Sequence, residues 1–85
     1  MMYNAIHQYT TIERAKNMTN TKLLKEVVKA SGLKKKFIAE QIGASYRSYL
    51  NKENGITGFF ADELCVMVRL LNLSEQEMMN IFFAP

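Results

Sequence analysis

Residues 34–55 read KKKFIAEQIGASYRSYLNKENG, and this stretch decides the fold. Its first part, KKKFIAEQI, predicts a short helix because apolar side chains recur there at helical spacing. That helix is expected to bury Phe37, Ile38 and Ile42 and to end at Gly43. Glycine adopts the left-handed conformation that ends many helices at little energetic cost. We therefore expect the chain to turn sharply at Gly43.

A second helix follows after a link of only about three residues. Ser45 is a competent N-cap for a helix over YRSYLNKEN, which ends at Asn54 and Gly55. So short a link between helices with inward apolar faces forces a steep crossing, and the small side chain of Ala39 permits close approach. Tyr49 would point inward and hold the second helix against the first. The stretch therefore predicts a helix-turn-helix.

Amphipathic helices flank this stretch on both sides. Before it, TKLLKEVVKASG predicts a helix capped by Asn20 or Thr21 and ended by Gly32, whose apolar face consists of Leu23, Leu24, Val27 and Val28. After it, the phenylalanines of the loop ITGFF can plug the core, ADELCVMVRLLN predicts a fourth helix, and Ser74 caps a fifth over EQEMMNIFF. The fold class is therefore predicted to be all-α, with five helices.

The first 19 residues differ in pattern from the rest. They fit a short amphipathic helix or a loosely docked arm, since apolar side chains stand about three residues apart at Tyr3, Ile6, Tyr9 and Ile12. Met18 is a candidate for an alternative translation start. We therefore divide the chain into an N-terminal arm or extension, residues 1–19, and a helix-turn-helix domain, residues 20–85.

Composition argues against several classes of protein. With one cysteine, Cys65, and one histidine, His7, the chain has neither a disulfide framework nor a Cys/His cluster at zinc-ligand spacing. Cys65 is instead expected in the core or an interface. Because catalytic triads and Gly-rich phosphate loops are absent, we expect no enzyme, cofactor, metal or small-molecule ligand. No apolar run reaches the roughly 18 residues of a membrane span, so a cytoplasmic protein is expected.

Charge is unevenly distributed along the chain, whose net charge is +3. Residues 14–52 hold ten Lys/Arg and two acidic residues, a net charge of +8. Residues 53–85 hold one Arg and five acidic residues, a net charge of −4. Such a basic segment favours a polyanionic partner, for which double-stranded DNA, an acidic membrane surface and an acidic protein all qualify.

The segment AEQIGASYRSYLNKENG resembles the Ala-x-x-x-Gly-x-Ser and terminal Asn-Gly pattern of phage Cro and repressor proteins. The similarity extends over residues 20–83, because the order of helices and the aromatic loop also match that family. The resemblance implies a five-helix, lambda-repressor-like bundle. It further implies a sequence-specific, double-stranded-DNA-binding transcriptional regulator, a Cro-like phage or prophage repressor that occludes its operator.

The resemblance also implies a DNA-facing set of side chains. Lys35 would meet a phosphate, Tyr46 and Arg47 would meet base edges, Asn51 would face the groove, and Asn54 would approach the backbone. The chemistry agrees, since Arg bonds guanine O6 and N7 in pairs, and Asn does the same with adenine N6 and N7. Further lysines expected to neutralise phosphates are Lys34, Lys36 and Lys52.

Two residues depart from the family pattern. Lys35 stands where the family often has Gln, and Glu53 stands where many relatives have an apolar residue. The first departure suggests strongly salt-dependent DNA binding. The second places a charged side chain in the last turn of the helix, and we expect Glu53 to pair there with Lys52 or Arg47.

The fourth helix is apolar nearly all round, which exceeds what one core-facing stripe requires. This surplus suggests a homodimer through the last two helices, with an interface at Met67, Leu70, Met78 and Phe82. Two copies would place their DNA-contacting helices about 34 Å apart, one turn of DNA. The alternative function is a protein-interaction module, an antitoxin or antirepressor, which uses the same fold to bind a protein partner.

Overall fold

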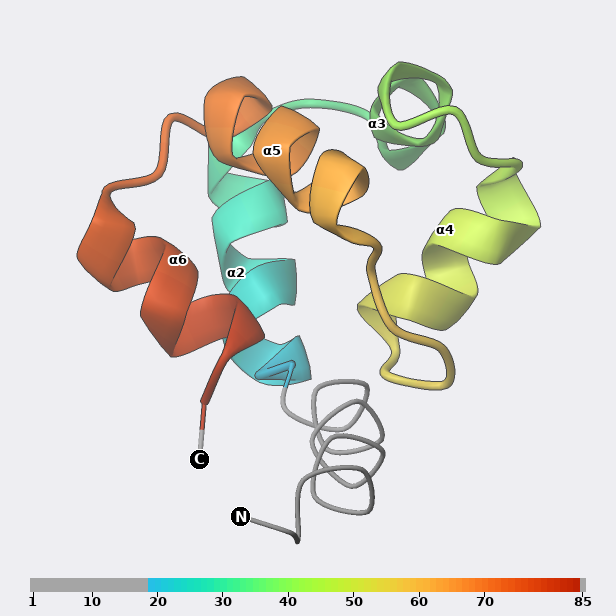
Figure 1. Ribbon diagram of the computed structural model, residues 1–85. Helices are drawn as coiled ribbons and strands as arrows, with labels where there is room; N and C mark the ends of the chain where they lie inside the picture. Colours follow the sequence, from blue (N-terminus) through green and yellow to red (C-terminus); the bar gives the residue numbers. More distant parts are fainter. Residues whose placement is uncertain (1–18, 85) are drawn as a thin grey trace, which may run out of the picture.

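The computed structural model describes residues 19–84, and the expectations for Tyr3 to Met18 lie outside this range. The described residues form five helices and no strand, so this part of the chain is all-α (Figure 1). The helices are α2 (Thr21–Ser31), α3 (Lys35–Gln41), α4 (Tyr46–Glu53), α5 (Ala61–Leu70) and α6 (Glu75–Phe82). Among the described residues, no helix is long and apolar enough to cross a membrane.

Local capping explains where most of these helices begin. The side chain of Asn20 accepts a hydrogen bond from the Leu23 backbone N–H, and Ser45 accepts one from Ser48, both at 3.0 Å. At α6, Ser74 and Glu77 form a reciprocal capping box, with each side chain bonded to the other residue's N–H at 3.1 and 2.8 Å. All three polar caps expected from the sequence are therefore confirmed.

The two helices that flank Gly43 cross steeply. Figure 1 views α3 nearly along its axis, whereas α4 runs across the picture. Gly43 has a φ of +77°, in the left-handed region that favours glycine, and Ala39 is buried where α3 packs on α4. The sharp turn and the close approach expected from the sequence are thus present.

The core draws on all five helices. α4 packs on α2 and α3, α6 packs on α2, and α5 packs on α3. The buried apolar side chains between them are Leu24, Val28, Ile38, Ala39, Ile42, Tyr49, Met67, Ile81 and Phe82. Phe59 joins this core from the α4–α5 loop, with its ring edge-on to Tyr49 and Phe82 at centroid distances of 6.5 and 5.3 Å. One of the two loop phenylalanines therefore plugs the core as expected.

Two expectations about burial are wrong. Phe37 is 41% exposed because the inward stripe of α3 consists of Ile38, Ala39 and Ile42, and the side chain of Phe37 points away from it. Phe60 is 69% exposed because it lies at the N-cap of α5 and only its neighbour turns inward. Cys65 is exposed, which excludes the core position expected for it and leaves the interface position untested.

The expected dimer interface requires correction as well. Met67 and Phe82 are 0% and 3% exposed, because α5 and α6 turn these side chains into the domain's own core. Leu70 and Met78 are half-buried and also pack against that core. Two of the four residues are therefore not available to a second copy.

Candidate nucleic-acid interface

Helix α4 has two faces of different character. Its inward face carries Tyr49, Lys52 and Glu53, and all three are buried. Their spacing of i, i+3 and i+4 places them on one side of the helix. At about 100° per residue, the opposite face carries Arg47 and Asn51, which are four residues apart and therefore lie one above the other. The sequence thus places an arginine and an asparagine together on the side of α4 that faces away from the core.

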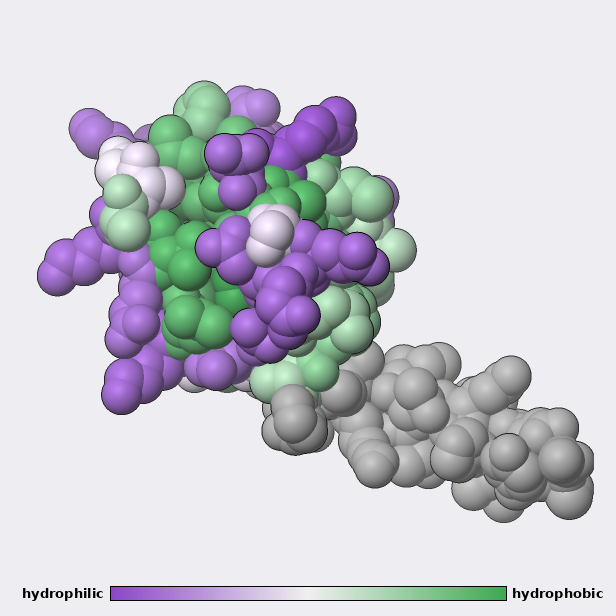
Figure 2. Space-filling model, turned by 90° about the vertical axis from the view of Figure 1, so that its left-hand side faces the viewer, coloured by the Kyte–Doolittle hydropathy of each residue, from purple (hydrophilic) through white to green (hydrophobic). Residues whose placement is uncertain are grey.

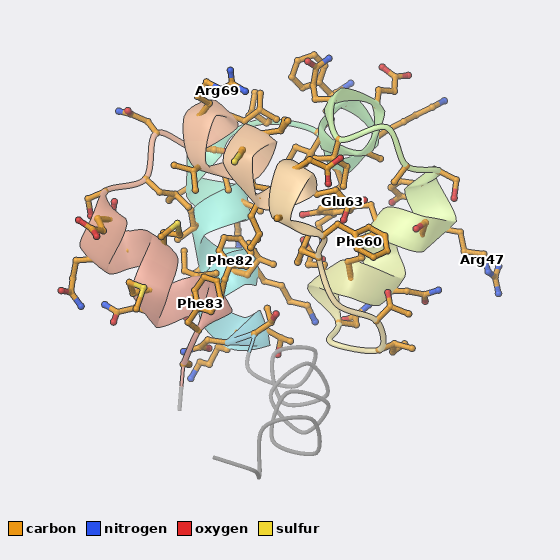
Figure 3. The ribbon with its side chains drawn as sticks, viewed as in Figure 1. Arg47, Phe60, Glu63, Arg69, Phe82 and Phe83 are labelled. Atoms are coloured by element: carbon orange, nitrogen blue, oxygen red, sulfur yellow. The ribbon has the colours of Figure 1, made fainter. Side chains whose placement is uncertain are left out.

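The outward side chains differ in how freely they reach solvent. Arg47 is exposed, and Figure 3 shows it extending from α4 away from every other element. Asn51 is half-buried, and Tyr46, in the first turn, is 49% exposed. Asn54 is exposed at the helix end, where its side-chain amide donates to the Leu50 carbonyl at 2.9 Å. The four residues expected to face DNA from α4 therefore all retain solvent contact.

The lysines at the start of α3 do not behave alike. Lys34 and Lys36 are exposed. The side chain of Lys35 is 40% exposed, and its Nζ lies 2.8 Å from Oε1 of Glu53 at the far end of α4. This contact corrects the expectation that Glu53 pairs with Lys52 or Arg47. Lys35 lies at the edge of the inward stripe of α3, since it precedes Ile38 by three residues and Ala39 by four.

Lys52 contradicts its expected role as a phosphate contact. Its side chain is only 6% exposed, and its Nζ lies 3.1 Å from Oε1 of Glu63 on α5. The same Nζ donates to the Gly58 carbonyl at 3.1 Å and sits over the Phe60 ring, 4.7 Å from its centroid. Figure 3 shows Glu63 and Phe60 between α5 and α4. Lys52 therefore holds α4 to α5 and to the loop instead of facing solvent.

Glu53 is the most buried charged side chain of the described domain, with 1% exposure. Its Oε1 accepts from Lys35 and its Oε2 accepts from the Tyr49 hydroxyl at 2.9 Å, so both oxygens are bonded. Burial raises the pKa of Tyr49 far above its ordinary value, and the charge and hydrogen bond of Glu53 raise it further. Tyr49 therefore acts as a hydrogen-bond donor whose proton is strongly retained.

Sequence reasoning missed this polar inner face as a unit. Periodicity located Tyr49 inside, but it assigned Lys52 to the surface because lysine is rarely buried unless it is paired. The available signal was spacing: Lys52 and Glu53 stand three and four residues after Tyr49, on the same helical face. Their partners on α3 and α5 are distant in sequence, so no local pattern predicted them.

A second surface feature lies between α5 and α6. A groove of about 380 Å³ is lined almost entirely by apolar side chains, namely Ala61, Leu64, Cys65, Val68, Met78 and Phe83. Figure 2 shows hydrophobic surface between hydrophilic side chains on the side of the molecule that carries α6. Within residues 19–84, no cluster of three or more His, Cys, Asp or Glu is arranged to hold a metal ion.

The arrangement of α3 and α4 offers cations and hydrogen-bonding side chains on one exposed helix and at the start of its neighbour. Comparison of the chain with protein-family models, with curated proteins and with solved structures finds no match.

Proposed function

We propose that this protein is a transcriptional regulator that binds double-stranded DNA in a sequence-specific manner, with α3 and α4 acting as a helix-turn-helix. The observation that carries the proposal is the outward pair on α4, Arg47 and Asn51, on a helix whose opposite face is fixed to the domain. An α-helix fits the major groove, where the donor and acceptor pattern of each base pair is distinct. In this arrangement α4 enters the groove and α3 crosses the backbone.

Each exposed side chain then has a defined role. Arg47 forms paired hydrogen bonds with guanine O6 and N7, and Asn51 does the same with adenine N6 and N7. Tyr46 contacts a thymine methyl or a phosphate beside them. Lys34, Lys36 and Asn54 meet the backbone, which positions the domain without specifying sequence. Lys52 is no longer part of this set, because it is buried and paired with Glu63.

The decisive experiment is selection of bound duplexes from a random pool at about 150 mM salt, where non-specific electrostatic binding is weak. Recovery of a defined motif is expected. Arg47→Ala and Asn51→Ala should each lower affinity for that motif by about 1–3 kcal/mol and relax the preference at one base pair. Arg69→Ala is the matched control, because Arg69 is an exposed arginine on α5 (Figure 3) and should leave the selected motif unchanged. A pool without enrichment would contradict the proposal.

The proposal includes a homodimer, because one short helix in one major groove contacts only a few base pairs. The groove between α5 and α6 is the surface for the second copy; it lies on the two helices expected from the sequence and includes Met78 of the expected interface. Its rim includes Phe83, which is 38% exposed, and the neighbouring Met79 is 46% exposed. Large exposed apolar side chains of this kind favour association of two copies, after which the dimer would block polymerase from an operator.

Sedimentation tests this part separately. The wild-type protein is expected to be a dimer on DNA, with an inverted repeat as its selected site. Phe83→Ser should shift it towards monomer while leaving the helical circular dichroism intact. A monomer at micromolar concentration, both free and on DNA, would contradict the dimer but not the DNA contacts of α4. If no DNA motif is selected, the alternative function, a protein-interaction module, explains the apolar groove better, as a binding site for a protein partner.

A further inference from the structure

The inner face of α4 is charged where an apolar face would be usual. Tyr49, Lys52 and Glu53 are 0%, 5% and 1% exposed, so all three are inside the domain. No buried side-chain nitrogen or oxygen of the described residues lacks a hydrogen-bond partner. Buried ionic groups contribute little to net stability, since their desolvation offsets their attraction. Their presence on this helix therefore calls for an explanation other than stability.

The bonds of this face connect α4 to two other helices. Glu53 accepts from Lys35 of α3 at 2.8 Å and from Tyr49 at 2.9 Å. Lys52 pairs with Glu63 of α5 at 3.1 Å. Charge-assisted hydrogen bonds are short and depend on the orientation of donor and acceptor. Together these bonds define both the rotation of α4 about its axis and its position along that axis.

Rotation of α4 matters because the outward pair lies opposite the inner face. With a helix radius of about 5–6 Å including side chains, a rotation of about 10° moves a side-chain end by roughly 1 Å. Binding constellations must be held within about 0.5 Å and 10–20° of their productive geometry. A small rotation would therefore impair the paired hydrogen bonds of Arg47 and Asn51 to base edges.

We propose that Glu53, together with Lys35 and Tyr49, is a positioning set that fixes the rotation of α4 for base recognition. This inference rests on the proposed function and assigns Lys35 to the interior network instead of a phosphate. Lys35 and Glu53 form a neutral pair, so Lys35 contributes little net positive charge to the DNA-binding surface. Specificity for DNA then depends on side chains that do not touch DNA.

Glu53→Gln distinguishes this positioning role from a purely electrostatic effect on DNA binding. The two predict opposite changes in the affinity for the selected motif. Loss of a negative charge from a DNA-binding domain should strengthen binding to every sequence. Loss of positioning should instead weaken binding to the selected motif only. Glu40→Gln is the matched control, since Glu40 is an exposed carboxylate on α3 outside the network. The measurement is the ratio of affinities for the selected duplex and a scrambled duplex at fixed salt.

We expect Glu53→Gln to lower this ratio by about tenfold, comparable to the loss of one paired base contact. Affinity for the scrambled duplex should stay the same or rise, and Glu40→Gln should keep the wild-type ratio. If Glu53→Gln strengthens binding to both duplexes as Glu40→Gln does, the positioning role is wrong. If the wild-type protein prefers no sequence, the proposed function fails and the positioning role fails with it.

A second variant tests the proposal even if Glu53→Gln does not fold. In Lys35→Met/Tyr49→Phe/Glu53→Met the whole set is apolar, so no buried charge is left without a partner. It should keep the helical circular dichroism, lose the preference for the selected motif, and keep the slope of log affinity against log salt. Lys36→Met should lower that slope by about 0.9, the loss of one phosphate contact. An equal fall in slope for the triple variant would place Lys35 on a phosphate and overturn the assignment.

Discussion

Replacement of Lys52 by Met decides whether this lysine serves the interior of the domain or a DNA phosphate. In the structure its Nζ is 3.1 Å from the Glu63 carboxylate, and the two side chains are 6% and 10% exposed. Removal of one partner of such a buried pair costs about 3–5 kcal/mol, because the other charge is left without compensation. Glu63 retains its bond from the Phe60 N–H at 2.8 Å, which places the expected loss near the lower end.

A loss of about 3 kcal/mol is large for a domain of this size, whose total free energy of unfolding is on the order of 5 kcal/mol. Urea denaturation followed by circular dichroism measures it directly. Lys52→Met/Glu63→Gln removes both charges and should recover most of the stability lost by Lys52→Met alone. The reasoning is refuted if Lys52→Met loses less than about 1 kcal/mol and also lowers the salt slope of DNA binding by about 0.9. That result would return Lys52 to the DNA-facing surface.

Three further predictions concern the stability of the described domain. Because burial raises the pKa of Tyr49 above its ordinary value of 10.0, only the unfolded chain loses this proton just above that pH. The free energy of unfolding should fall there by up to about 1.4 kcal/mol per pH unit, and Tyr49→Phe should remove that slope. Gly43→Ala should cost about 1–2 kcal/mol in urea denaturation, since φ is +77° and a Cβ would meet nothing within 4 Å. Ser74→Ala should lower the thermal midpoint through loss of about 1 kcal/mol of capping, whereas an unchanged midpoint would show that the cap is dispensable.

The helices could be predicted from the sequence because their determinants are local. An oxygen-bearing side chain at Asn20, Ser45 or Ser74 bonds a backbone N–H three residues later, and both partners are adjacent in the chain. Glycine at positions 32 and 43 ends the preceding helix through its own backbone conformation, with φ of +75° and +77°. None of these effects depends on how the helices pack.

Burial was less predictable because it depends on where the helices meet. Hydrophobicity alone placed Phe37 inside and Lys52 outside, and both assignments are reversed in the structure. On α3 the decisive fact is the crossing with α4, which turns Ile38 and Ala39 inward and leaves Phe37 at the surface. On α4 the decisive fact is Glu63, a partner eleven positions after Lys52 and on another helix. A lone lysine in a basic stretch gives no sign of such a partner.

Lys35 and Glu53 were the two residues that departed from the sequence pattern of the Cro and repressor proteins. Considered separately, each residue weakens that resemblance. Lys35 replaces the amide group of a glutamine by a charge, and Glu53 places a charge where many relatives have an apolar residue. In the structure they contact each other at 2.8 Å, and Tyr49 bonds the second oxygen of the same carboxylate. Without Lys35, the carboxylate of Glu53, which is 1% exposed, would lose its cation, and this loss is destabilising, whereas Lys35 is 40% exposed and can be hydrated without Glu53. Lys35 and Glu53 therefore form one contact between α3 and α4, and Arg47 and Asn51 lie on the opposite, outward face of α4.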